Sequence, residues 1–191
     1  MFFMLVVAAA LACSARASVC ICTTVACPTQ GKNTITMGNG HANIEYTYQQ
    51  HGDHVVVVSA TGTIDPASLD TGTGTTTCTQ EYSRMLEDDG YQNCDAGHIL
   101  ANRLGGYGNE PTNIFPQLAS VNRGIYAQFE GNIYECMQTA LRGKLTWEFK
   151  YDGPERTMPA SIHYTAAFDG GNCTTLNSFF PNYVNQTETS K

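Results

Sequence analysis

The residues with the clearest chemical potential lie between positions 95 and 130. Asp95-Ala96-Gly97-His98 places a histidine directly after a glycine, and three carboxamides and a carboxylate follow it: Asn113, Gln117, Asn122 and Glu130. A neutral imidazole can accept a proton at ordinary pH, because its usual pKa is about 6.5. Amide and carboxylate oxygens are ligands that hard cations such as Mg²⁺ accept. A base beside such a cation is suited to metal-assisted hydrolysis of a phosphodiester.

The motifs in this stretch resemble those of a known family. They read Asp95-Ala96-Gly97-His98, Leu104-Gly105-Gly106, Asn113-Ile114-Phe115-Pro116-Gln117, Asn122-Arg123-Gly124 and Glu130. In these motifs and their spacing the sequence resembles the DNA/RNA non-specific endonucleases, a branch of the ββα-metal (His-Asn-His) nucleases. The resemblance covers about residues 84 to 171. It implies an α+β, ββα-metal nuclease fold, in which antiparallel strands surround a site built from a β-hairpin and a helix.

The resemblance also implies a role for each residue. His98 is expected to be the general base, and Asn122 the single protein ligand of Mg²⁺, with Mn²⁺ as an alternative. Glu130 and Asp95 are further catalytic candidates, although Glu130 could be an exposed helix charge and Asp95 could fix the turn. Asn113 and Gln117 are expected to form a supporting polar shell. The implied substrates are DNA and RNA, cut internally to leave 5′-phosphate ends.

One position departs from the family pattern. The family usually has Asp-Arg-Gly-His, with the arginine reaching the phosphate, whereas this chain has Ala96 there. Loss of one preorganised donor typically costs about 10²-fold or more in rate. Arg84, Arg103 and Arg123 are the candidates to supply a guanidinium instead, and the sequence leaves the choice among them open.

Hydrophobic periodicity predicts the elements that position these residues. Alternation predicts strands over 44–48, 144–151 and 161–168, and the β-branched run 55–58 predicts a strand buried on both faces. Residues 65–77 are rich in Thr, Gly, Ser and Asp and predict a long loop. Apolar residues recur every three or four positions from 117 to 142, which predicts a helix. On a regular helix Asn122, Tyr126 and Glu130 would share one face.

The two ends of the chain are expected to lie outside the folded domain. Residues 1–17 combine an apolar run with the small-x-small sequence Ala15-Arg16-Ala17, which is typical of a secretory signal. We expect a single nuclease domain over 18–180 and a polar tail over 181–191. No later segment is long and apolar enough to span a membrane. The prediction is therefore a secreted, extracellular protein whose oligomeric state is open.

Secretion favours disulfides for the cysteines. Seven follow the predicted signal, at positions 20, 22, 27, 78, 94, 136 and 173. In an oxidising compartment these are expected to form disulfides rather than a zinc site. Because seven is odd, one thiol is free, one pairs between chains, or the cleavage site lies elsewhere.

The charge of the chain is the main physical objection to a nucleic-acid substrate. The chain carries −7, and loss of Arg16 with the signal leaves 9 basic and 17 acidic residues, a net charge of −8. Proteins that bind duplexes through phosphates usually show a basic stripe. A bound divalent cation supplies local positive charge that this count omits. The alternatives to an active nuclease are a catalytically weak or inactive nuclease-fold binding protein and an extracellular disulfide-bonded domain with no nucleic-acid role.

Overall fold

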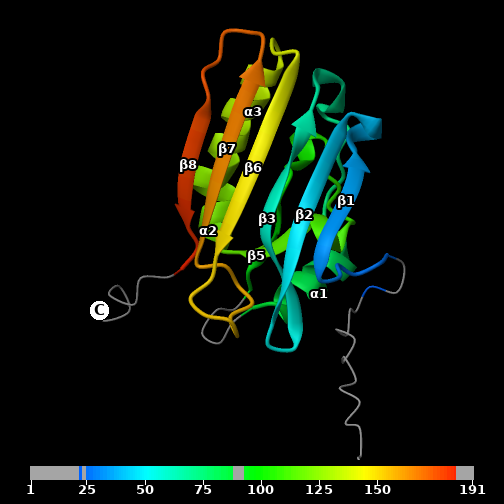
Figure 1. Cartoon of the computed structure of the whole chain (residues 1–191), viewed down its shortest axis with the longest axis vertical. Coiled ribbons are helices and arrows are strands. Elements are labelled where there is room, and N and C mark those ends of the chain that lie inside the picture. Colours follow the sequence, from blue (N-terminus) through cyan, green and yellow to red (C-terminus); the bar gives the residue numbers. More distant parts are fainter. Residues whose placement is uncertain (1–21, 23–24, 88–92, 184–191) are drawn as a thin grey trace, which may run out of the picture.

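One layer of the molecule is a six-stranded antiparallel sheet. The computed structural model describes residues 22, 25–87 and 93–183, so the predicted signal and residues 184–191 of the predicted tail lie outside the described residues. The strand order is β1-β2-β3-β6-β7-β8 (Figure 1). The strands are β1 (Gly31–Met37), β2 (Ala42–His51), β3 (His54–Ile64), β6 (Arg142–Lys150), β7 (Ser161–Asp169) and β8 (Leu176–Pro181).

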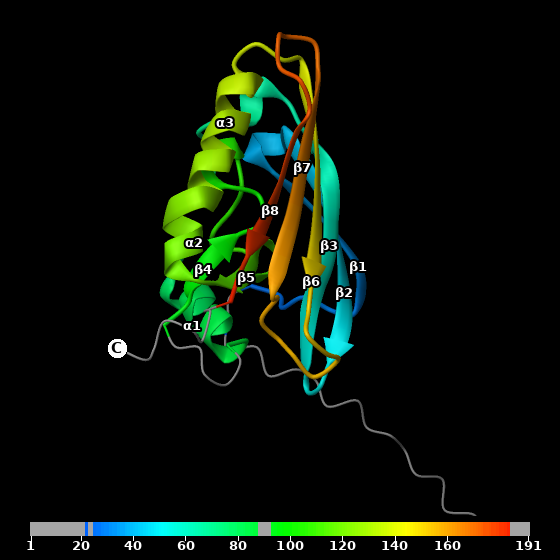
Figure 2. The ribbon, with the colours of Figure 1, turned by 90° about the vertical axis from the view of Figure 1, so that its left-hand side faces the viewer.

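The second layer covers one face of this sheet (Figure 2). It contains α1 (Thr77–Met85), α2 (Ala119–Val121), α3 (Ala127–Met137) and a separate hairpin-like pair, β4 (Asp95–His98) and β5 (Ile114–Gln117). All of it is inserted between β3 and β6, which pair directly with each other in the sheet. The candidate residues therefore belong to one excursion of the chain that leaves and returns to neighbouring strands.

The strands form where alternating apolar side chains can face the second layer. On β2, Ala42, Ile44, Tyr46 and Tyr48 are all at most 1% exposed, while the residues between them are more exposed. The valine run predicted to be buried on both faces is buried at its centre. Val57 packs in the main core and Val56 in a smaller cluster with Tyr82 of α1.

The long helix predicted over 117–142 is shorter and interrupted. It consists of α2, a π-helical turn over Asn122–Tyr126, and α3. Within that turn Gly124 leaves the helical region, at φ −108° and ψ −111°. Apolar periodicity therefore overestimated the buried face: Ile125 is 50% exposed, and Leu141, beyond the helix end, is 78% exposed.

Several elements carried no clear sequence signal. The strands β1 and β8 and the helix α1 were not predicted, whereas β4 and β5 form the hairpin that the family resemblance implied. α1 is marked by a capping box between Thr76 and Thr79, a pattern that stabilises a helix start. Asn182, just beyond β8, is 1% exposed and bonds to the backbone of Leu118 and Pro116. Packed structure thus continues past residue 180.

The predicted disulfides are present. Cys22 pairs with Cys78 and Cys136 with Cys173, and Cys27 is also disulfide-bonded. Cys94 is a free, buried thiol, which accounts for the odd cysteine. The two described disulfides attach the N-terminal arm to α1 and the end of α3 to the β7–β8 turn. Among the described helices, none has the length and apolar character needed to cross a membrane.

Candidate active site

His98 lies at the end of β4 with one ring nitrogen already engaged. Its Nε2 is 3.1 Å from the backbone carbonyl oxygen of Thr73. A carbonyl oxygen can only accept, so Nε2 must carry the hydrogen and a neutral ring is left with its lone pair on Nδ1. Burial lowers the pKa of His98 below its ordinary value, and the hydrogen bond to Thr73 offsets this only in part. The ring is therefore held as a neutral base at ordinary pH.

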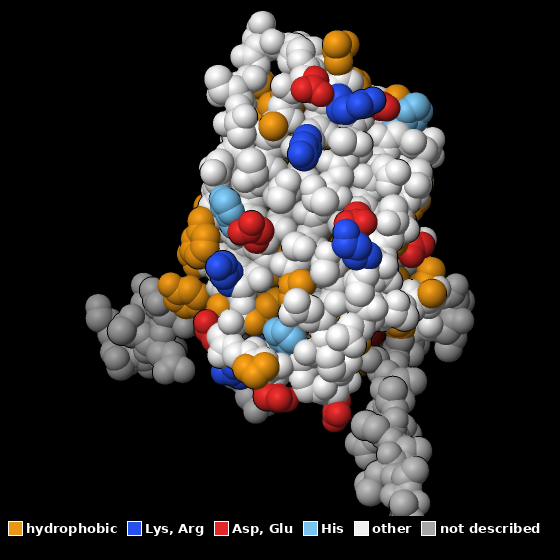
Figure 3. Space-filling model, in the orientation of Figure 1, with side chains coloured by type: hydrophobic (Ala, Val, Ile, Leu, Met, Phe, Trp, Pro, Cys, Tyr) orange, Lys and Arg blue, Asp and Glu red, His pale blue; other side chains and the backbone are white. Residues whose placement is uncertain are grey.

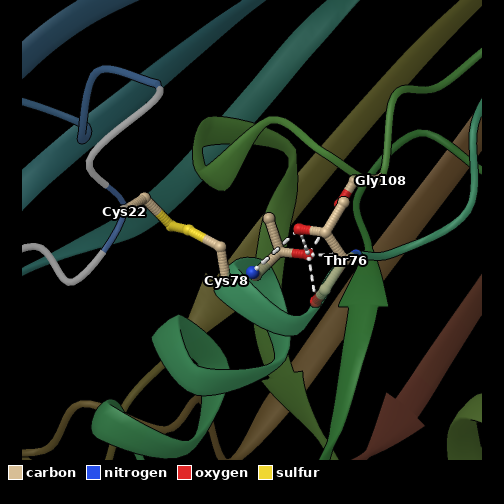
Figure 4. The surroundings of a disulfide bond; sticks show 5 residues. Cys22, Thr76, Cys78 and Gly108 are labelled. Carbon is tan, nitrogen blue, oxygen red and sulfur yellow. Dashed lines mark hydrogen bonds between the residues drawn. A yellow bond between two sulfur atoms is a disulfide. The ribbon is translucent and has the colours of Figure 1, made fainter.

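The loop that carries Thr73 is fixed from both sides. The Thr73 amide donates to the Gly106 carbonyl, and the Gly108 amide donates to the Thr73 carbonyl, each at 3.0 Å. The Thr79 hydroxyl donates to the Gly108 carbonyl at 2.8 Å. Figure 4 shows Gly108 beside Thr76 at the start of α1, near the Cys22–Cys78 disulfide. Sequence analysis missed Thr73 and Gly108, because Thr73 acts through a backbone carbonyl that has no signature in residue type.

The Asp95 carboxylate joins the strand to the helix start. Its Oδ2 accepts from Asn122 Nδ2 at 2.9 Å and from Arg123 Nε at 2.8 Å, and its Oδ1 accepts from Arg123 Nη2 at 2.6 Å. Burial raises the pKa of Asp95, but the hydrogen bonds from Arg123 and Asn122 outweigh it and the net pKa is lowered. Asp95 is therefore an ionised acceptor, which is a structural role for this catalytic candidate.

The same contact sets the orientation of Asn122. An ionised carboxylate cannot donate, so the amide nitrogen of Asn122 must face Asp95 and Oδ1 must point away from it. Orientation of a ligand by an outer carboxylate is how protein metal sites are commonly arranged. A free amide oxygen is a suitable donor for Mg²⁺. Arg123, which on a regular helix would point about 100° away from Asn122, reaches the same carboxylate with its long side chain.

Asn113 and Gln117 lie in the interior rather than at the surface of the site. Asn113 is fully buried, and its Oδ1 accepts from the Tyr46 hydroxyl and the Leu100 amide, each at 2.8 Å. Its Nδ2 donates to the carbonyls of Leu100 and Tyr107. The amide of Asn113 is thus fully used in holding the loop after β4 against β2. Gln117 is also fully buried, and neither polar atom of its side chain has a hydrogen-bond partner in the described structure.

Glu130 lies in the first turn of α3 with its carboxylate buried. Among the described residues, Glu130 Oε1 has no hydrogen-bond partner, and no hydrogen bond joins Glu130 to Asp95, His98 or Asn122. Burial raises its pKa to about 8, although the Arg103 guanidinium lowers it. Arg103 itself lines a cavity of about 140 Å³ with Asp70 and Tyr134. Glu130 and Arg103 therefore form a second group, which shares no hydrogen bond with Asp95, His98 or Asn122 among the described residues.

The position that lacks the family arginine faces the core. Ala96 is 4% exposed and packs in the small apolar cluster with Val56, Tyr82 and Leu86. Arg84 is exposed on α1, and no hydrogen bond or ion pair links its side chain to the described site residues. Of the three candidate arginines, only Arg123 has a hydrogen bond, within the described structure, to Asp95, the carboxylate that also binds Asn122.

Comparison with known proteins agrees with this arrangement. The family model for DNA/RNA non-specific endonucleases matches residues 32–169. The chain belongs to the DNA/RNA non-specific endonuclease family. The family prediction and the ββα-metal fold prediction are both confirmed.

A curated relative and two solved structures extend the comparison. A probable deoxyribonuclease, RhsA of Dickeya dadantii, is 40% identical over 120 residues, which are 63% of this chain and 8% of that protein. NucA of Streptococcus agalactiae with magnesium bound has a TM-score of 0.50 at 14% identity, covering 80% of this chain and 85% of that chain. A chain of the EndoG/EndoGI complex has a TM-score of 0.52 at 12% identity, covering 85% and 78%. These two structures show the shared fold.

Gly108 offers a test of how His98 is held. A Cβ at Gly108 would lie 2.5 Å from His98 Nε2 and 2.5 Å from the Gly74 backbone. We expect Gly108→Ala to displace the ring toward water, so that the pKa of His98, measured by NMR titration, rises toward about 6.5. Gly74→Ala is the matched control, because a Cβ there meets nothing within 4 Å. An unchanged His98 pKa in Gly108→Ala would contradict the packing described.

The buried carboxylate of Glu130 gives a second test. Because its folded-state pKa, about 8, lies above the usual 4.5, folding favours the protonated form, and stability is lost as pH rises from about 4.5 through about 8. Glu130→Gln removes this penalty, so it should raise the free energy of unfolding at pH 8 by roughly 2–4 kcal/mol and have little effect at pH 4.5. Denaturation at both pH values checks this. Glu135→Gln, an exposed position on α3, should change neither value.

Proposed function

We propose that this protein is a secreted, metal-dependent endonuclease that hydrolyses phosphodiester bonds in DNA and RNA. His98 acts as the general base and Asn122 as the protein ligand of Mg²⁺, for which Mn²⁺ is the alternative. The observation that carries the proposal is the hydrogen bond from His98 Nε2 to the Thr73 carbonyl at 3.1 Å. It leaves Nδ1 as the free base on an imidazole that burial keeps neutral.

The donor set at Asn122 fits a magnesium ion. Asp95 binds the amide nitrogen of Asn122 and leaves the amide oxygen free to act as a metal ligand. One such oxygen ligand suits a hard cation that keeps several waters. Asn122 would hold the ion through Oδ1. The bound cation would stabilise negative charge on the phosphoryl group and on the leaving oxygen. The nearby Asp95 would keep the amide from rotating.

The chain's own residues account for the proton transfer. Nδ1 of His98 accepts a proton from the attacking water, and the developing imidazolium keeps its Nε2 hydrogen bond to the Thr73 carbonyl. That carbonyl dipole favours the charged ring, as its effect on the pKa of His98 shows. The base therefore needs no acidic partner side chain. Its position depends on the loop packed against Gly108 and on the start of α1.

Location and substrate class have separate supports. Two described disulfides and a third bonded cysteine favour an oxidising compartment, which supports secretion. The family description names both DNA and RNA, and RhsA is named a probable deoxyribonuclease. These names support nucleic acid as the substrate.

Cleavage of supercoiled plasmid and of RNA by the oxidised protein tests the proposal, with Mg²⁺, Mn²⁺ or EDTA. We expect metal-dependent cleavage, lowered about 10²–10⁴-fold in His98→Ala because the base is lost. Asn122→Ala should require much higher Mg²⁺. Asn132→Ala, an exposed asparagine on α3, is the matched control and should behave as wild type. Absence of cleavage under all these conditions would reject the enzyme and favour an inactive nuclease-fold binding protein.

The pH dependence of the reaction should report the lowered pKa of His98. The base works when neutral, so kcat/KM should rise with pH through the pKa of His98 and then level off. Because burial moves that pKa downward, the midpoint of the rise should lie below about 6.5. Initial rates between pH 4.5 and 8.5 at saturating metal measure it. A midpoint at or above 7 would contradict the assignment of His98 as this base.

A further inference from the structure

The guanidinium of Arg123 is hydrogen-bonded along one edge, and its other edge has no partner among the described residues. Its Nε and Nη2 donate to the two oxygens of Asp95 at 2.8 and 2.6 Å, a bidentate pair. Within the described part of the chain these are its only hydrogen bonds, and its side chain is 73% exposed. The hydrogens of Nη1 and one hydrogen of Nη2 therefore face outward. A planar guanidinium fixed in this way has its remaining donors preorganised for a second oxyanion.

The guanidinium lies next to the Asn122 amide. Arg123 Nε and Asn122 Nδ2 both donate to the same oxygen, Oδ2 of Asp95. Because both nitrogens bond to the same oxygen, the distance between them cannot exceed the sum of the two hydrogen-bond lengths. A phosphate drawn to a cation on Oδ1 of Asn122 would therefore lie near the guanidinium as well.

Neither position 96 nor Arg103 is placed to do this. A longer side chain at position 96 would start inside the apolar cluster that Ala96 shares with Tyr82 and Leu86. Arg103 lies toward Glu130 and the cavity it lines with Asp70 and Tyr134. The positive charge missing from β4 is found instead at the helix start, on a residue adjacent to Asn122.

We propose that Arg123 contacts a backbone phosphate of the nucleic-acid substrate and takes the place of the absent arginine at position 96. This inference rests on the proposed nuclease function. Asp95 then has two tasks: it orients the Asn122 amide, and it holds one edge of the guanidinium so that the other edge meets the phosphate. The acidic chain thereby presents a positively charged guanidinium at the point where it must bind the nucleic-acid backbone.

The test compares Arg123→Gln and Arg123→Lys with wild type. For Arg123→Gln we expect kcat/KM to fall about 10²-fold. Arg123→Lys should recover only part of this loss, since an ammonium cannot bind Asp95 and phosphate through two fixed edges. Arg142→Gln is the matched control: Arg142 is exposed and begins β6, beyond the far end of α3 from Asn122. It should cut at the wild-type rate.

A binding measurement separates phosphate contact from support of Asn122. In the His98→Ala background with Mg²⁺, the DNA is bound without being cut, and the dissociation constant is measured across salt concentrations. Loss of one phosphate contact should reduce the slope of log K against log salt by about 1 in Arg123→Gln. Mg²⁺ affinity is measured in parallel by calorimetry.

The outcomes are distinct. A lower rate with a reduced salt slope supports the proposal. A wild-type rate, or a lower rate with an unchanged slope and weakened Mg²⁺ binding, overturns it and leaves the nuclease function standing. If wild-type protein cuts nothing under any metal, the nuclease function fails and this inference fails with it.

Discussion

The Asp95 carboxylate is the constraint on which the candidate site depends. It is partly buried and accepts three hydrogen bonds from Asn122 and Arg123, while its own backbone carbonyl accepts from the Ser83 hydroxyl of α1. One residue thus ties together β4, α1 and the π-helical turn. Because the burial cost of the charge is outweighed by these donors, the carboxylate stays ionised. Removing Arg123 would leave this partly buried charge with only the Asn122 donor, so the two residues and Asp95 stabilise one another.

The acidity of the chain is compatible with a polyanionic substrate once local charge is considered. The face of the sheet seen in Figure 3 carries basic and acidic side chains that are interspersed, some of them adjacent to a group of opposite charge. On the opposite layer, Arg123 and the amide nitrogen of Asn122 donate to the same oxygen of Asp95. Substrate affinity in such a site depends on one or two close contacts and a bound cation rather than on a broad basic surface. Binding of this kind is sensitive to salt.

Residue type and spacing were sufficient to identify the family and the candidate residues, but several of their roles depend on distant partners. Asn113 was expected in a polar shell, yet its amide is used up between Tyr46 on β2 and the loop at Leu100. The helix was predicted from its apolar period, but its interruption at Gly124 changed which residues are exposed. Strand β1 and helix α1 were missed because threonine-rich segments give weak periodic signals.

The sequence alone determined the chemistry available: one histidine, the carboxamides and carboxylates around it, the cysteines that form disulfides, and the strands whose side chains alternate. These are local properties, because they follow from residue type and from periods of two or of three to four residues. The tertiary structure alone decided that Thr73 sets the tautomer of His98, that Ala96 faces the core, and that Arg123 meets Asp95. Each of these depends on contacts between residues about 25 or more positions apart, or on which face of a strand is buried, and neither is encoded in local periodicity.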